Sequence, residues 1–151
     1  YPAIAVDRHW NLISANRMVP PLLEGVAPSL LAPPLNVMRL SFHPEGLAPR
    51  TVNLAEWCAH LLERLHRQCE TTADPVLIAV PARKTPHLVG ADALAVPFQM
   101  RAGDDVLSFI STTMVFGTPL DVTLSELALE TFFPADETTT AFLHRMAKGL
   151  G

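Results

Sequence analysis

Basic residues are scarce in this chain. Lysine and arginine together number 11 against 15 aspartates and glutamates, which gives a formal net charge of −4 at pH 7. A domain that grips nucleic-acid phosphates usually carries a basic excess on one face, so this segment is a poor candidate for contacting DNA itself. The chain also lacks an apolar run close to the roughly 18–20 residues of a membrane-spanning helix. The sequence therefore predicts neither direct DNA binding nor a transmembrane helix.

Cysteine is almost absent, with only Cys58 and Cys69. Both fall in a single predicted helix, where the rise of about 1.5 Å per residue separates them by roughly 16 Å. A disulfide needs Cα atoms within about 7 Å, so the two residues cannot pair within one copy of the intact helix. A reduced, cytoplasmic setting is therefore expected.

Glycine is scarce and proline abundant, with 7 and 14 of 151 residues. Proline pairs at Pro20-Pro21 and Pro33-Pro34 separate elements rather than fill a disordered tail. With 49% hydrophobic residues the chain can bury a core, and we expect one domain over residues 1–151. Because the sequence starts at Tyr1 rather than Met, we expect it to be part of a longer protein.

Two short strands and a short helix are predicted at the start of the chain. Ala3–Val6 is apolar and is followed by turn residues, and Trp10–Ala15 fits the returning strand of a hairpin. Met18–Leu23 is an apolar segment that its prolines keep brief, which predicts a short helix. Leu35–Phe42 is also apolar, but its period distinguishes neither a helix nor a strand.

The best-defined element is a helix over Leu54–Glu70. Asn53 fits its N-cap, and Glu56 three residues later completes a capping-box pattern. Apolar side chains recur at steps of three and four residues and form one stripe, which contains Leu54, Trp57, Cys58, Leu61, Leu62, Leu65 and Cys69. The charged side chains are expected to face water, and they are Glu56, Glu63, Arg64, Arg67 and Glu70.

The C-terminal half changes to the alternating pattern of half-buried strands. Leu94–Met100 and Val106–Phe116 are predicted to form a hairpin around a turn at Ala102–Asp105, with a loop of either two residues (Gly103 and Asp104) or four. The turn fixes which side chains oppose one another, and the predicted pairs are Met100–Leu107, Phe98–Phe109, Val96–Ser111 and Leu94–Thr113.

A third strand and a closing helix complete the predicted fold. Leu124–Phe133 is the third strand, Pro134 ends it, and Asp136 caps a helix over Glu137–Lys148. The side chains expected to point inward from this helix are Ala141, Phe142 and Met146. Two short strands, helices, a three-stranded antiparallel meander and a last helix make an α+β domain, with about five strands and helices packed on one face.

Catalytic and metal-binding patterns are weak. His66 and Cys69 are three residues apart and could contact one ion, but no third and fourth ligand joins them. The sequence has no Gly-x-Ser-x-Gly elbow and no glycine-rich phosphate loop, and thiols on an apolar stripe are poorly ionised. We therefore expect no metal, no cofactor and no enzymatic activity.

Four segments resemble the MmyB-like ligand-binding domain found after a helix-turn-helix in bacterial XRE-type transcription regulators. They are residues 6–16 (VDRHWNLISAN), 36–44 (NVMRLSFHP), 111–119 (STTMVFGTP) and 130–136 (ETFFPAD). The resemblance implies a PAS-like fold and a sensory role in transcription regulation. It also implies a pocket between sheet and helices for an apolar small molecule, with long-chain fatty acids as the expected class, and a DNA-binding helix-turn-helix domain upstream of Tyr1.

The pocket is expected beneath the strand Val106–Phe116, where Ser111 and Thr113 share the predicted inward face with Phe109. A buried hydroxyl without a partner costs roughly 1–3 kcal/mol. These hydroxyls therefore either bond to neighbouring groups or face the polar part of a ligand. The candidate ligand-binding residues are Asn36, Met38, Arg39, His43, Trp57, Leu61, Leu65, Val96, Phe98, Met100, Phe109, Ser111, Thr113 and Met114.

Within this set, Asn36, Arg39 and His43 are candidates for holding the anionic end of a fatty acid. The alternative for Arg39 is a solvated side chain. For the apolar members the alternative is ordinary core packing.

Two functions remain open. The first is a regulatory domain that senses a fatty acid and reaches DNA only through the domain expected upstream. The second is a dimerisation or protein-interaction module with a filled core and no ligand, which would show a large apolar patch on the outer sheet face or the first hairpin. In both, the protein is expected in the bacterial cytoplasm without a membrane partner, and a homodimer is a further expected partner.

Overall fold

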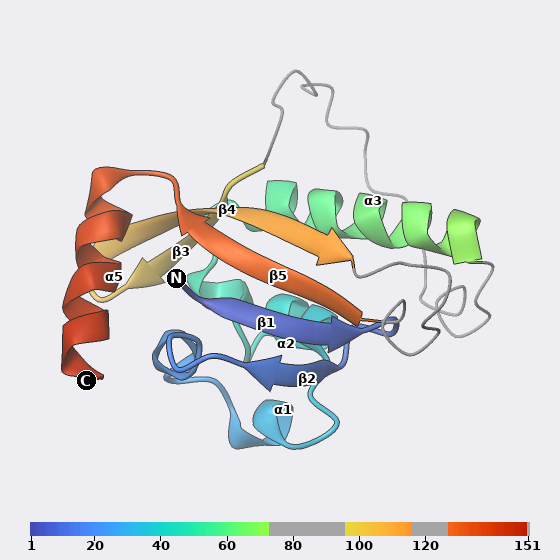
Figure 1. The fold of residues 1–151 in the computed structure, drawn as a ribbon, viewed down its shortest axis with the longest axis horizontal. Helices are drawn as coiled ribbons and strands as arrows, with labels where there is room; N and C mark the ends of the chain where they lie inside the picture. The colour runs from blue at the N-terminus through green and yellow to red at the C-terminus, as the bar shows by residue number, and fades with distance from the viewer. Residues whose placement is uncertain (73–95, 116–126, 151) are drawn as a thin grey trace.

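The computed structural model describes residues 1–72, 96–115 and 127–150. In this part of the chain, five strands form an antiparallel sheet with the order β2-β1-β5-β4-β3 (Figure 1). The strands are β1 (Ala3–Asp7), β2 (Leu12–Ala15), β3 (Phe98–Ala102), β4 (Asp105–Val115) and β5 (Leu127–Pro134). The predicted meander is the run β3-β4-β5, so the α+β fold with a PAS-like sheet is confirmed.

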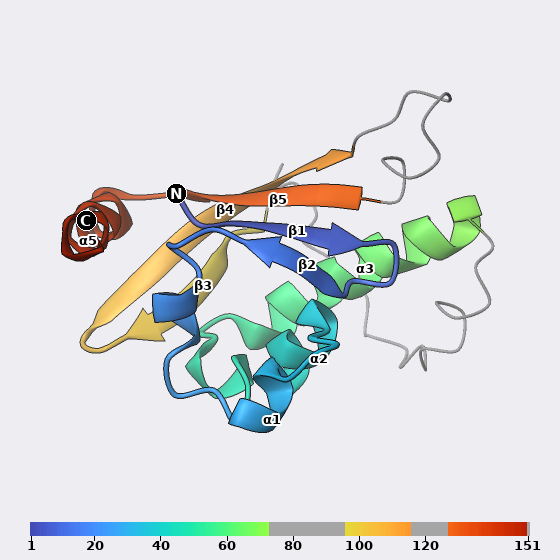
Figure 2. The same ribbon diagram turned by 60° about the horizontal axis from the view of Figure 1, so that its bottom comes forward.

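The helices lie on one face and at one end of this sheet. They are the 3₁₀ segments η1 (Pro20–Leu23) and η2 (Ala48–Arg50) and the α-helices α1 (Pro28–Leu31), α2 (Val37–Phe42), α3 (Leu54–Thr72) and α5 (Glu137–Gly149). Figure 2 shows α1, α2 and α3 together on one side of the sheet, while α5 lies at its end. None of the helices in these described ranges is long and apolar enough to cross a membrane.

The β3–β4 hairpin follows the predicted register. Phe98 opposes Phe109 and Met100 opposes Leu107, and Gly103 with φ 62° opens the two-residue loop, where type II′ turns favour glycine. The predicted pair of Val96 with Ser111 is wrong because β3 begins only at Phe98, after a proline that has no N–H to donate to a ladder. The predicted partner of Thr113, Leu94, lies outside the described residues.

The first hairpin is shorter than predicted. β2 begins at Leu12 because Trp10 takes a left-handed backbone conformation, with φ 67°, which belongs to a turn and not to a strand. The carboxylate of Asp7 holds this turn by accepting hydrogen bonds from the backbone N–H groups of His9 at 2.8 Å and Asn11 at 2.9 Å. The predicted helix over Met18–Leu23 is only the 3₁₀ segment η1.

The ambiguous segment before residue 43 is helical. Asn36 caps α2 by accepting a hydrogen bond from the backbone N–H of Arg39 at 3.1 Å. The Asn36 side chain also donates to the carbonyl of His9 at 2.8 Å and so fixes α2 against the first hairpin. A two-way anchor of this kind explains why a short helix persists here, since so few residues are not stable as an isolated helix.

Helix α3 carries its apolar stripe as predicted. Trp57, Leu61 and Leu65 are each 4% exposed and form its buried face. Asn53 directly precedes α3 as predicted, and its backbone carbonyl accepts from the N–H of Trp57 at 3.0 Å, but its side chain bonds elsewhere. The side-chain oxygen of Asn53 accepts from the backbone N–H of Gln99 at 3.1 Å, and the side-chain amide donates to the carbonyl of Pro97 at 2.7 Å. Asn53 therefore joins the start of α3 to the start of β3.

Helix α5 lies beside the first residues of β4, which precede the point where β4 begins to pair with β5. Asp136 caps it as predicted, accepting from the backbone N–H of Thr139 at 2.7 Å. The hydroxyl of Thr139 accepts from the backbone N–H of Ser108 at 2.8 Å, just beyond the point where β5 ends. Leu143, 1% exposed, is the main inward side chain. Phe142 and Met146 pack partly against the core as predicted, whereas Ala141 is exposed, so its predicted inward position is wrong.

Candidate ligand-binding site

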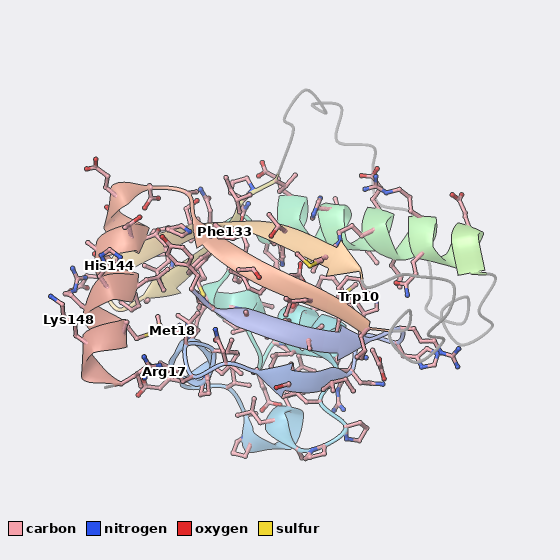
Figure 3. The ribbon with its side chains drawn as sticks, viewed as in Figure 1. Trp10, Arg17, Met18, Phe133, His144 and Lys148 are labelled. Atoms are coloured by element: carbon pink, nitrogen blue, oxygen red, sulfur yellow. The ribbon has the colours of Figure 1, made fainter. Side chains whose placement is uncertain are left out.

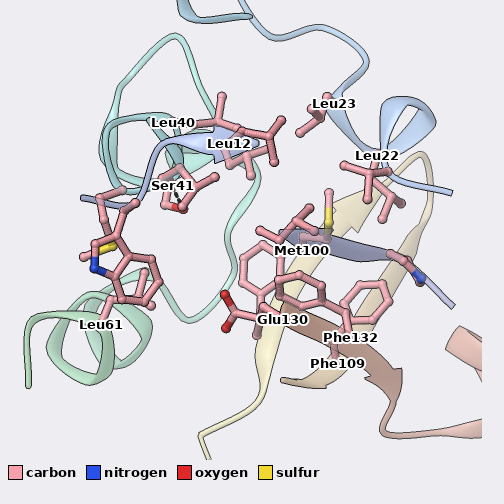
Figure 4. Close-up of a pocket in the computed structure, with 18 of the residues that line it drawn as sticks. Leu12, Leu22, Leu23, Leu40, Ser41, Leu61, Met100, Phe109, Glu130 and Phe132 are labelled. Atoms are coloured by element: carbon pink, nitrogen blue, oxygen red, sulfur yellow. Dashed lines mark hydrogen bonds between the residues drawn. The ribbon is translucent and has the colours of Figure 1, made fainter. Parts of the chain in front are cut away.

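A cavity lies between the inner face of the sheet and the helices α2 and α3 (Figure 4). The volume of this cavity is about 100 Å³. Two of its lining side chains, Ser41 and Glu130, are polar, and the rest are aliphatic, aromatic or thioether groups. The lining residues are Pro2, Ile4, Trp10, Leu12, Val19, Leu22, Leu23, Leu35, Val37, Met38, Leu40, Ser41, Leu47, Trp57, Leu61, Phe98, Met100, Phe109, Glu130 and Phe132.

Aromatic rings build the wall of the cavity on the sheet side. The ring of Phe98 lies 5.0 Å from Trp57, 6.2 Å from Phe109 and 6.4 Å from Phe132, measured between centroids. Phe109 and Phe132 meet edge to face at 6.4 Å. Rings packed at these separations support one another, so this wall keeps its shape when the cavity is empty.

The polar end of the cavity is a buried ion pair. Glu130 on β5 is 4% exposed, and its Oε1 atom lies 2.7 Å from Nη1 of Arg64 on α3. The other terminal nitrogen of Arg64, Nη2, donates to the hydroxyl of Thr113 on β4 at 2.7 Å. Arg64 was expected to face water, and this expectation is wrong because its guanidinium pairs with two strands of the sheet, which leaves the side chain 16% exposed.

The same guanidinium connects the cavity to the first hairpin. It lies over the ring of Trp10, 4.9 Å from the centroid, in a cation–π contact. The indole N–H of Trp10 donates to Oε1 of Gln68 at 2.9 Å, and the amide of Gln68 donates to the carbonyl of Arg8 at 2.7 Å. Two successive turns of α3 are thus bound to the turn between β1 and β2.

Comparison with known proteins identifies this architecture. The family model of the MmyB-like transcription regulator ligand binding domain matches residues 1–146. The chain belongs to this family. No curated protein matches it in sequence. Membership gives this MmyB-like domain a ligand-binding role in transcription regulation, with a small molecule as its ligand, and the family is not one of enzymes.

Six of the predicted ligand-binding residues line the cavity of this MmyB-like domain. They are Met38, Trp57, Leu61, Phe98, Met100 and Phe109. Two more lie close by, since Leu65 belongs to the neighbouring core cluster with Trp10, and Val96 packs partly buried against the main core. The apolar part of the prediction therefore falls largely around one space.

The predicted polar residues do not line that space. Asn36 caps α2, Arg39 is exposed, and Nδ1 of His43 accepts from the backbone N–H of Glu45 at 3.1 Å. Thr113 accepts its hydrogen bond from Arg64, in line with the alternative of a locally bonded hydroxyl.

The last two predicted residues lie on β4 beyond the cavity lining. Ser111 is half-buried opposite Phe132 of β5. Met114 is 58% exposed, because side chains alternate along β4 and Met114 falls on the outer face of the sheet.

Sequence analysis of the MmyB-like domain missed Glu130, the charged residue at the cavity. Alternation along β5 places Glu130 on the same face as Phe132, which is a readable sign that a carboxylate points inward. The partner Arg64 is 66 residues away in sequence, and no local pattern connects the two. Trp10, Leu12 and Ser41 were also missed as lining residues.

Burial favours the neutral form of two titratable groups in the MmyB-like domain. Partial burial raises the pKa of the Cys58 thiol, as expected for a thiol on an apolar stripe. Burial, followed by the positive charge of Arg64, lowers the pKa of His60, whose ring stacks on Trp57 at 5.4 Å. The described residues contain no group of three or more His, Cys, Asp or Glu side chains placed to hold a metal ion. The side chain of Cys69 lies outside that description, so its predicted proximity to His66 stays a prediction.

Proposed function

We propose that this domain senses an apolar molecule of the fatty-acid class, whose hydrocarbon chain enters the cavity between the sheet and α2 and α3. The single observation that carries the proposal is the cavity itself, because its walls are apolar and Glu130, the one charged residue among its described lining, belongs to an ion pair. An apolar space with few polar groups is how small-molecule sites are usually built. The bacterial cytoplasm, as expected from the reduced cysteines, is the proposed compartment.

The volume of the cavity favours a short chain unless its walls move. A water occupies roughly 30 Å³ of the liquid, and a cavity of about 150 Å³ holds one benzene ring, so about 100 Å³ accommodates roughly four non-hydrogen atoms. A chain of about eight carbons therefore needs the walls to move apart. At about 0.8 kcal/mol for each buried CH₂ it gains roughly 6 kcal/mol before the costs of that movement and of binding.

The first hairpin is the proposed element through which the ligand acts. Ile4 and Leu12 of this hairpin line the cavity, so a bound chain contacts β1 and β2 directly. The side chain of Asn16 then ties the hairpin to the chain start, accepting from the backbone N–H of Ala3 at 3.2 Å and donating to the carbonyl of Tyr1 at 2.7 Å. We place the DNA-binding helix-turn-helix domain upstream of Tyr1, where a shift of this hairpin reaches it first. A ligand shifts the equilibrium between two positions of this hairpin only if it binds the two with different affinities.

The experiment is to fill the cavity from one wall. Ser41→Phe places a ring in the space and removes only a hydroxyl that donates to the carbonyl of Val37 within α2, at 2.8 Å. We expect native mass spectrometry to find one octanoate or octan-1-ol bound to the wild-type domain, and calorimetric titration to show affinity for these chains about tenfold or more weaker in Ser41→Phe.

Ser14→Phe is the matched control, because Ser14 is an exposed residue of β2. It receives the same ring outside the cavity and should bind as the wild type does. A wild-type domain that takes up neither chain, or a Ser41→Phe variant with unchanged affinity for a chain that binds, would contradict the proposed site.

A second function, self-association, is favoured by the outer face of the sheet. Ile110 and Phe133 oppose each other there and are each 40% exposed, and the ring of Tyr1 lies 5.4 Å from that of Phe133. Phe133 is labelled on β5 in Figure 3. Exposed apolar clusters commonly mark interfaces. We expect sedimentation velocity to find a dimer that Ile110→Lys converts to a monomer. Leu31→Lys on α1 is the control and should remain dimeric, and a monomeric wild type at high concentration would exclude this function.

A further inference from the structure

The carboxylate of Glu130 has one oxygen free to meet a ligand. Its Oε1 atom is occupied by Arg64 at 2.7 Å, while Oε2 has no hydrogen-bond partner within residues 1–72, 96–115 and 127–150. The residue is 4% exposed and lines the cavity. In Figure 4 its carboxylate points toward the open middle of the cavity. No fully buried side-chain nitrogen or oxygen of the described residues lacks a partner, so solvent reaches Oε2 in the cavity, and a ligand that displaces this solvent must supply a donor to avoid the cost of an unpaired acceptor.

Two further polar groups of the described lining are already engaged. The hydroxyl proton of Ser41 is donated to the carbonyl of Val37 inside α2. The indole N–H of Trp10 is donated to Gln68. The remaining polar group of this lining, the indole N–H of Trp57, is a donor, so among the described lining side chains Glu130 supplies the charged acceptor.

Charge excludes an anionic end group at this position. Arg64 does not line the cavity, and its positive charge is already paired with Glu130. The lining residues within the described chain include no cation. A ligand carboxylate beside Glu130 would be a second negative charge in a site of low polarity, with no counter-ion of its own, and such an arrangement is strongly unfavourable.

Charge also disfavours an ammonium group. Arg64 already neutralises Glu130, so a ligand cation would leave a net positive charge buried in the cavity. A neutral hydroxyl supplies the missing donor without changing the net charge. Its hydrogen bond to a carboxylate is of the stronger, charge-assisted kind.

We propose that Glu130 selects the polar end of the ligand, so that the cavity takes an aliphatic chain ending in a neutral hydroxyl in preference to the corresponding carboxylate. This inference rests on the proposed ligand-binding function and changes its head group, because it keeps the aliphatic chain of a fatty acid but replaces the ionised carboxylate by the hydroxyl of the corresponding alcohol. It also replaces Arg39 by Glu130 as the residue that recognises the polar end.

The test compares probes that share one chain length. Octan-1-ol, octanoate and heptyl methyl ether are titrated calorimetrically at about pH 8, where the carboxyl of octanoate is ionised. The ether is an isomer of the alcohol that has lost only the O–H donor. We expect the wild-type domain to bind octan-1-ol about tenfold or more tightly than either of the other two probes.

Glu130→Gln tests the residue itself. The amide removes the negative charge, offers a donor and releases Arg64 for a carboxylate, so octanoate should gain about tenfold or more relative to octan-1-ol. Glu63→Gln is the matched control, since Glu63 is an exposed residue of α3 whose carboxylate lies 3.7 Å from Arg67. It should keep the wild-type preference. If Glu130→Gln does not fold, the comparison of alcohol with ether in the wild type still tests the inference.

The outcomes separate this inference from the proposed function. Octanoate binding as tightly as octan-1-ol, with octanoate weakened by Arg39→Ala, would overturn the role of Glu130 and leave the sensor function standing. Equal affinities for the alcohol and the ether would also overturn it. Failure of all three probes to bind would remove the proposed function together with the inference.

Discussion

Trp10 is held in a conformation that a bulky side chain seldom adopts, with φ 67°. The structure around it supplies the compensation, since its backbone N–H donates to the carbonyl of Asp7 at 3.0 Å, its indole N–H donates to Gln68, and Arg64 lies over its ring. Although partial burial alone would raise it, hydrogen bonds from Asn11 and from the backbone of His9 bring the pKa of Asp7 below its ordinary value. Strain of this kind persists only where neighbouring groups enforce it, and here the strained residue lines the cavity.

His60 should make the stability of the domain depend on pH. Its pKa is lowered in the folded state by burial and then by Arg64, so folding favours the neutral ring. The stability that this gives is present above the unfolded-state pKa of 6.5 and is lost as the pH falls below it. Urea unfolding at a series of pH values between about 5 and 8 should show the decline, and His60→Gln should flatten it.

His66 on the same helix provides the control for this measurement. It is exposed, and His66→Gln should leave the pH profile as in the wild type. A profile that stays unchanged in His60→Gln would show that other groups cause the pH dependence.

At the scale of single residues, the sequence predicted the positions of apolar side chains better than those of charged side chains. Trp57, Leu61 and Leu65 follow from helical periodicity alone, because a stripe of large apolar side chains has only one stable place to go. Arg64 is adjacent to that stripe, and the general tendency of charged side chains to face water gave the wrong answer. Its burial depends on Glu130 from a distant strand, and this tertiary pairing leaves no trace near either residue.

At the scale of the elements, the connection from α2 to η2 has no room for a side chain at Gly46. A Cβ atom on Gly46 would collide with the backbone carbonyl of Leu40, which also accepts a hydrogen bond from the backbone N–H of Leu47 at 2.9 Å. Leu40 and Leu47 both line the cavity. The close approach at Gly46 therefore fixes one wall of the site.

Gly46→Ala should destabilise the domain by about 1–3 kcal/mol, the usual cost of inserting a methyl group where the backbone must move. Chemical denaturation measures this free energy of unfolding. Gly149→Ala is the control, because a Cβ at the end of α5 meets nothing within 4 Å, and its effect should be neutral. A Gly46→Ala variant as stable as the wild type would mean that the α2–η2 connection yields easily.

Thr139→Val tests how α5 is attached to the sheet. The substitution keeps the shape of the side chain but removes the acceptor of the buried Ser108 N–H, so the free energy of unfolding should fall by about 1–3 kcal/mol. Thr138→Val on the exposed side of the same helix should change it by less than about 0.5 kcal/mol. Equal effects of the two substitutions would show that helix propensity, and not the bond to Ser108, is responsible.

The elements themselves were largely predictable wherever local rules applied. The register of β3 and β4 follows from a short glycine turn and the parity of the flanking apolar residues, and Asp136 is a helix cap of the usual kind. Asn53 has the same signature but bonds to Gln99 instead. Local preference therefore fails where a strand that arrives later in the chain offers the better partner.

For the molecule as a whole, the helices on one face of the sheet enclose a space that they do not fill. The sequence indicated the fold and the apolar residues around this space, because both follow from patterns that span whole elements. It could not give the volume of the cavity or the residue at its polar end. These depend on how side chains from β5, α2 and α3 meet.

Ligand binding should raise the melting temperature of the entire domain. A ligand at a hundred times its dissociation constant stabilises the folded state by about 2.7 kcal/mol, which for a chain of this size corresponds to a rise of roughly 5–11 °C. Differential scanning calorimetry with and without octan-1-ol measures the shift. Ser41→Phe, with an affinity about tenfold weaker, should show at most about half of this shift at the same ligand concentration, and an equal shift in that variant would place the bound molecule elsewhere.

The chain contains two tryptophans, Trp10 and Trp57, and both border the cavity. One contacts the guanidinium of Arg64 and the other the ring of Phe98. An aliphatic chain bound as proposed should therefore contact both indoles at once and change the wavelength and intensity of their ultraviolet emission. The domain carries an intrinsic optical reporter of its own occupancy, and candidate molecules can be screened against unlabelled protein.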